Sequence, residues 1–96
     1  MKAKITKLDI AEYLETDEDI REFLCESAQN ATPEEFIHAL NTAARAKGMT
    51  EVASQAGVTR ASLYKSLSED GDPKFSTIMK VIKALGLEGC IQAPGQ

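Results

Sequence analysis

The residues with the clearest chemical potential lie between Thr59 and Leu67. Leu63 and Leu67 are four residues apart, so in a helix they share one face and would anchor it to a core. The side chains left on the outer face combine cations, hydroxyl groups and one small contact residue, and they are Arg60, Ala61, Ser62, Tyr64 and Lys65. Such groups hydrogen-bond to base edges and phosphates. The outer face therefore suits the major groove of DNA.

The segment from Thr50 to Leu67 predicts two short helices that position these side chains. Thr50 is expected to cap a first helix that ends at Ala56, where Gly57 permits a positive φ. Thr59 is expected to cap the second helix. Only three residues separate the two helices, too few for an antiparallel pair, so the pattern indicates a helix-turn-helix arrangement.

The same residues also have plainer interpretations. Two helices with a glycine between them occur in many small α-domains, and Arg60 and Lys65 can be ordinary solvated charges. The Tyr64 ring can pack on the edge of the core and expose only its hydroxyl. A protein-interaction module that does not bind DNA therefore remains an alternative.

An enzyme has little support in the sequence. It contains no nucleophile–base pair and no phosphate-cradling glycine loop. His38 is the single histidine and is predicted to lie on the surface, so neither a metal site nor a cofactor is expected. Cys25 and Cys90 form neither a C-x-x-C pair nor a disulfide framework, and both are expected to be reduced.

Helix start and stop signals predict the rest of the fold. Asp9 and Thr16 each precede a helical pattern, Thr32-Pro33-Glu34-Glu35 is a stronger start signal, and Ser76 is expected to cap a last helix closed by Gly86. No run alternates as a strand does. We expect an all-α fold of five or six short helices in a single domain over residues 1–96. It would comprise an N-terminal helical extension (1–31), a helix-turn-helix core (32–87) and a tail (88–96).

The charge is unevenly distributed along the chain. The formal net charge of −4 argues at first against a nucleic-acid partner. Residues 1–44, however, hold four basic and ten acidic side chains, whereas residues 45–83 hold seven basic and four acidic ones. A net negative protein can bind DNA through a locally positive face. The acidic half has two interpretations, a set of solvated helix N-termini or a surface for a basic protein.

No stretch is long and apolar enough for a membrane span, so we expect a cytoplasmic chain.

The helix-turn-helix segment resembles a known family. Val52-Ala53-x-x-Ala56-Gly57-Val58-Thr59-Arg60-x-x-Leu63 looks like the signature of the Xre, or lambda-repressor-like, helix-turn-helix proteins. Residues 43–50, 61–75 and 81–87 extend the similarity to the HigA-like addiction-module antidote proteins, which are bacterial type II antitoxins. The combination of Leu63-Tyr64-Lys65-x-Leu67-Ser68 with Asp70-Gly71-x-Pro73-x-Phe75 is more specific than a helix-turn-helix alone.

The resemblance implies a homodimer that binds an operator in its own promoter and neutralises a RelE/ParE-like toxin. The family's DNA-binding positions fall on Thr59, Arg60, Ala61, Ser62, Tyr64 and Lys65 here. Arg60 is the best candidate for a base contact, while Lys65 and Thr50 are expected to reach phosphate. Many members carry a glutamine early in the first helix of the motif, where it contacts a phosphate. In this chain Glu51 stands nearby instead, so the resemblance does not imply this contact here. A helix-turn-helix regulator without a toxin partner is the alternative.

Overall fold

The computed structural model describes residues 9–68 and 70–86 of the chain. Within these ranges the chain forms one 3₁₀ helix and five α-helices, without a strand. They are η2 (Ile10–Tyr13), α1 (Asp17–Asn30), α2 (Pro33–Lys47), α3 (Met49–Ala56), α4 (Arg60–Ser66) and α5 (Phe75–Ala84). The prediction of an all-α fold of five or six short helices is confirmed.

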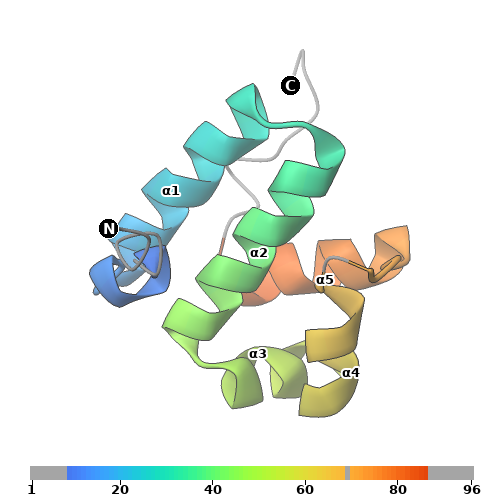
Figure 1. Ribbon diagram of the computed structural model, residues 1–96. Coiled ribbons are helices and arrows are strands. Elements are labelled where there is room, and N and C mark those ends of the chain that lie inside the picture. The colour runs from blue at the N-terminus through green and yellow to red at the C-terminus, as the bar shows by residue number, and fades with distance from the viewer. Residues whose placement is uncertain (1–8, 69, 87–96) are drawn as a thin grey trace, which may run out of the picture.

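Helices α1 and α2 form an antiparallel hairpin, and both begin where the sequence predicts. The Thr16 hydroxyl accepts the Asp19 N–H at 3.0 Å, and the Asp19 carboxylate accepts the Thr16 N–H at 3.3 Å. Thr32 and Glu35 repeat this capping box at 3.2 and 3.0 Å, with Pro33 in the first turn. Each box satisfies backbone donors that the first helical turn leaves free. The loop between the two helices lies at one end of the molecule, and α3 and α4 lie at the other (Figure 1).

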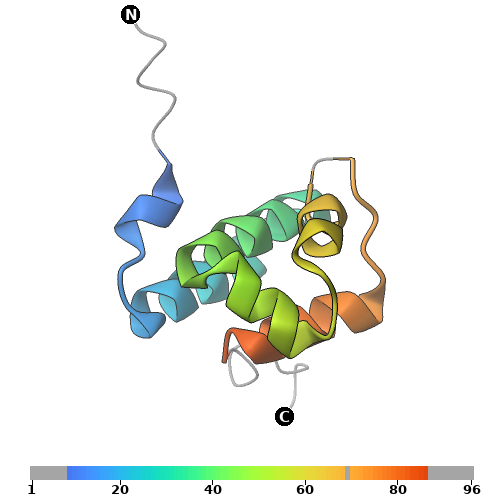
Figure 2. The ribbon, with the colours of Figure 1, turned by 90° about the horizontal axis from the view of Figure 1, so that it is seen from below.

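The hydrophobic core unites α1 to α5. Its largest fully buried side chains come from all five helices and are Leu24, Leu40, Val52, Leu63, Leu67, Val81 and Ile82. Helix α5 packs against α3, and η2 packs on α2 at the far side of the molecule from α5 (Figure 2). The described part of the chain therefore shares one core, and the division into an extension, a core and a tail stays a prediction. None of its helices has the length and apolarity needed to cross a membrane.

Two predicted caps are wrong. Helix α3 begins at Met49 after Gly48, whose φ of 122° turns the chain directly from α2 into α3, so Thr50 lies inside the first turn. Helix α5 begins at Phe75 after the extended residue Lys74, so Ser76 is inside the helix. Neither helix has a side-chain cap hydrogen bond. A hydroxyl near a helix start favours a cap, but the path of the preceding chain decides which residue occupies that position.

Candidate nucleic-acid interface

The turn between α3 and α4 has the geometry that the sequence predicts. Gly57 adopts the left-handed conformation, with φ 76° and ψ 27°. The Val58 N–H donates to the Ala53 carbonyl at 3.0 Å, and the Gly57 N–H donates to the Ser54 carbonyl at 3.2 Å. This pair of bonds is a Schellman motif, which ends a helix and redirects the chain. The Thr59 hydroxyl then accepts the Ser62 N–H at 3.0 Å and caps α4. The arrangement is compatible with a helix-turn-helix domain.

Helix α4 has one buried face and one exposed face. Leu63 and Leu67 are at most 2% exposed and hold the helix in the core. All the residues that the sequence assigns to the outer face are exposed, as is the N-cap Thr59, and they are Arg60, Ala61, Ser62, Tyr64 and Lys65. Thr50 is also exposed, but it lies in the first turn of α3 rather than on α4. The structure thus places five of the seven predicted residues on one short helix and a sixth, Thr59, at its N-cap.

Arg60 and Tyr64 contact each other on the exposed face of α4. The guanidinium carbon of Arg60 lies 5.1 Å from the centre of the Tyr64 ring, the geometry of a cation–π contact. Tyr64 remains 37% exposed. Its ring therefore supports the arginine side chain along the helix surface, and both residues remain accessible from solvent.

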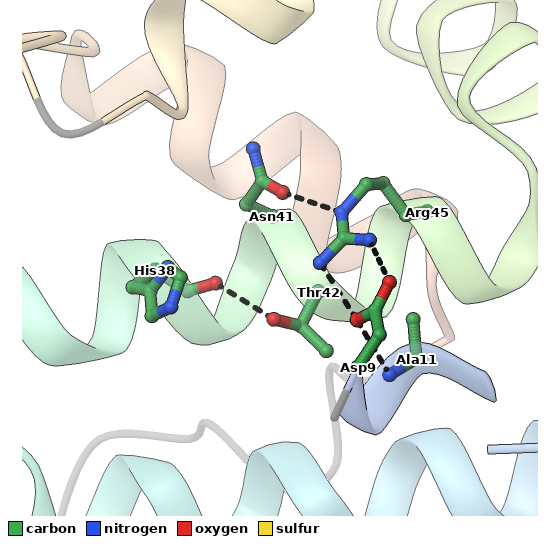
Figure 3. Close-up of polar contacts among 6 residues, drawn as sticks. All are labelled: Asp9, Ala11, His38, Asn41, Thr42 and Arg45. Atoms are coloured by element: carbon green, nitrogen blue, oxygen red, sulfur yellow. Dashed lines mark hydrogen bonds and ion pairs between the residues drawn. The ribbon is translucent and has the colours of Figure 1, made fainter. Parts of the chain in front are cut away.

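A polar cluster beside α4 includes residues that the sequence did not single out as functional (Figure 3). Two nitrogens of the Arg45 guanidinium donate to the two carboxylate oxygens of Asp9 at 2.6 and 3.2 Å. The third nitrogen, Nε, donates to the Asn41 side-chain oxygen at 2.9 Å. The Asn41 amide in turn donates to the carbonyl of Leu67, the C-cap of α4, at 3.3 Å. Asp9 and Arg45 are 36 residues apart, so no local spacing rule could find this pair.

The Asp9–Arg45 pair also shifts the titration of both groups. The hydrogen bond from Arg45, and secondarily the one from the Ala11 N–H, holds the pKa of the Asp9 carboxyl below its usual range. The hydrogen bond to Asp9 raises the pKa of Arg45, and the negative charge of the Asp9 carboxylate adds to this effect. Both groups are therefore charged at neutral pH.

A groove lies between α1 and α2, near the loop that joins them. Its volume is about 350 Å³, and its lining combines half-buried Phe23 with two carboxylates and small polar groups. The lining residues are Phe23, Glu26, Ser27, Asn30, Ala31 and Glu35. Exposed Glu22 and Glu34 lie on the same two helices. This end of the hairpin is therefore acidic, with one aromatic side chain among the carboxylates.

The other chemically active side chains have simpler positions. His38 is exposed, as the sequence predicts. The described ranges hold no group of three or more His, Cys, Asp or Glu side chains placed to bind a metal ion.

The expectation of reduced cysteines is wrong for Cys25, a half-buried residue of α1 that is disulfide-bonded. Cys90 lies outside the described residues.

Comparison with known proteins gives the family. A family model described as "probable addiction module antidote protein" matches residues 4–93, almost the whole chain. The chain belongs to this antidote family. The chain is also similar to an uncharacterized protein of Haemophilus influenzae, with 41% identity over 92 residues that cover 96% of this chain and 95% of the relative. No solved structure matches the chain.

The antidote family implies an antitoxin role and, in general, a toxin partner. It also points to a regulatory protein rather than a catalyst. The resemblance to addiction-module antidotes is thus confirmed at the level of the family. The HigA-like and Xre assignments stay predictions.

Proposed function

We propose that this antidote-family chain is a DNA-binding antitoxin that represses its own promoter and neutralises a RelE/ParE-like toxin in the cytoplasm. One observation carries the DNA-binding part. Helix α4 exposes Arg60, Ser62 and Lys65 while Leu63 and Leu67 fix it in the core. A helix held on one face and polar on the other can enter the major groove without losing its position.

The proposed contacts follow from the chemistry of each exposed side chain. Arg60, in the first turn of α4, is the candidate for a bidentate guanine contact, which contributes about 1–3 kcal/mol of discrimination. Lys65 and Thr50 are the candidates for phosphate contacts, which position a protein without reading sequence. A homodimer would place two α4 helices about 34 Å apart, one turn of DNA, and so read a palindrome.

The acidic groove between α1 and α2 supports a basic protein partner. Glu26 and Glu35 line it beside Phe23, and the groove lies at the end of the hairpin away from α3 and α4 (Figure 1). A toxin that cleaves RNA needs a basic surface for its substrate, and opposite charges speed association. DNA and toxin would then bind at opposite ends of the molecule.

The DNA-binding proposal is tested by removing the cations of α4. The double variant Arg60→Ala/Lys65→Ala should lose most of its affinity for a duplex of the chain's own promoter in a fluorescence anisotropy titration at moderate salt. Lys80→Ala/Lys83→Ala removes two exposed cations from α5 and is the matched control. Equal binding by the wild type and the α4 variant would overturn α4 as the recognition helix. A wild type that does not bind its promoter would overturn the DNA-binding proposal and favour a pure protein-interaction module.

The toxin part is tested with the product of the adjacent small reading frame. Co-expression should restore growth to cells that make this product, and the two chains should co-purify. A wild-type chain that binds its promoter but neither binds nor neutralises that product would instead be a helix-turn-helix regulator without a toxin partner.

A further inference from the structure

The Arg45 guanidinium is held in a conformation that presents two N–H groups to an anion. Its Nε is fixed by Asn41 at 2.9 Å, so the remaining nitrogens form a fork, which Asp9 occupies at 2.6 and 3.2 Å (Figure 3). The fork of an arginine binds a carboxylate and a phosphate with the same two-point geometry. The Asp9 carboxylate therefore occupies a pair of donors that can also bind a phosphate oxygen pair.

This anion site lies beside the helix that carries the proposed DNA contacts. Asn41, which fixes Arg45, also donates to the Leu67 carbonyl at the end of α4. The Arg45–Asn41 pair is thereby connected to the C-terminal end of α4, whose first turn carries Arg60.

The occupant of the site can leave at small cost. The Asp9 and Arg45 side chains are 35% and 30% exposed, so water reaches both charges and moderates the attraction between them. The helix that Asp9 caps, η2, has no buried residue and packs mainly on α2. By contrast, Arg45 and Asn41 belong to α2, which has five buried residues that anchor it in the core.

We infer that Arg45 is a phosphate-binding residue for the DNA backbone, and that Asp9 occupies it in the free protein as an internal competitor. This inference rests on the proposed DNA-binding function and adds a contact to it. When the operator binds, a DNA phosphate would replace the Asp9 carboxylate on the Arg45 guanidinium. The N-terminal segment that carries Asp9 would thereby lower operator affinity until it is displaced.

The test compares the two partners of this one ion pair on the chain's own promoter duplex. Asp9→Asn keeps the shape of the side chain and should raise affinity by up to about fivefold, since water moderates the competing ion pair. Arg45→Gln should lower affinity and reduce the slope of log K against log salt by about 0.9, the value for one phosphate contact. Arg45→Lys keeps the charge without the fork, so its salt slope should stay near the wild-type value.

Matched variants separate this effect from overall charge and from folding. Asp17→Asn breaks the ion pair with Lys47 and changes the net charge as Asp9→Asn does, and Arg21→Gln does the same for Arg45→Gln. Both controls should change affinity less than about twofold at 0.15 M salt, where charges more than about 8 Å apart are screened. Far-ultraviolet circular dichroism verifies that each variant keeps its helices.

The outcomes distinguish this inference from the function on which it rests. Opposite effects of Asp9→Asn and Arg45→Gln support an anion exchange. If both variants weaken binding or leave it unchanged, the pair only fastens η2 to α2 and the inference is overturned, while DNA binding through α4 stands. Wild-type protein that does not bind its promoter overturns the proposed function itself.

Discussion

Gly57 is the residue on which the path from α3 to α4 depends. Its φ of 76° lies in the left-handed region, and a Cβ there would meet nothing within 4 Å. The expected cost of Gly57→Ala is therefore conformational rather than steric, about 1–2 kcal/mol of the free energy of unfolding. Gly57→Asn should cost less, because asparagine tolerates this conformation. Urea denaturation measures both variants, and an equal loss for alanine and asparagine would contradict this explanation.

The Asp9 carboxyl makes the free energy of unfolding depend on pH, and the direction of this dependence is defined. The hydrogen bond from Arg45 lowers the pKa of Asp9 in the folded state. The pair therefore stabilises the fold above the unfolded-state pKa of about 3.9, and this contribution is lost as the pH falls through the lower folded-state value. Asp9→Asn should reduce stability at pH 7 and have no effect once wild-type Asp9 is protonated. Urea denaturation of both proteins from pH 7 to pH 2 measures the difference, and a difference that is constant over this range would contradict the assignment.

At the scale of the helices, hydroxyl groups near helix starts have unequal effects. Thr32 accepts the Glu35 N–H at the start of α2, whereas Ser76 lies inside α5 and makes no cap hydrogen bond. Thr32→Ala should cost about 1 kcal/mol of the free energy of unfolding, the usual value of a cap. Ser76→Ala, an exposed change away from a cap, should stay within about 0.5 kcal/mol. Thermal or urea denaturation compares them, and a larger loss for Ser76→Ala would place the cap of α5 where the sequence predicted it.

The same helices show which features the sequence could predict. Starts with two reciprocal cap bonds, at Thr16 and Thr32, are local in sequence, so composition and spacing were enough. The starts of α3 and α5 depend on how the preceding chain turns, which residue types near Thr50 and Ser76 do not specify. The outer face of α4 followed from the spacing of Leu63 and Leu67.

Local sequence patterns could not predict contacts between segments that are far apart in the chain. The side chains of Asp9 and Arg45 meet only because η2 packs across α2. Nothing within a few residues of either one marks the pair, so a three-dimensional structure was needed to find the anion site beside α4. The same holds for the groove that Phe23 and Glu35 line between two helices.

For the whole molecule, the separation of charge has a consequence for partner binding. The hairpin end carries the acidic groove, while α4 at the other end exposes Arg60 and Lys65. Reversal of Glu22 and Glu26 to lysine should therefore slow association with a basic toxin by about tenfold or more at low salt, because charge attraction accelerates encounter. Stopped-flow fluorescence at several salt concentrations measures the rate.

The matched control reverses two acidic charges in the basic half of the chain, residues 45–83. Glu51→Lys/Asp72→Lys changes the net charge by the same amount as Glu22→Lys/Glu26→Lys, and both of its residues are exposed. If the acidic groove guides the toxin, the control should slow association much less, and the difference between the two variants should shrink as salt screens the charges. Equal slowing by both variants would show that net charge alone attracts the toxin, and unchanged rates in both would place the toxin surface away from these carboxylates.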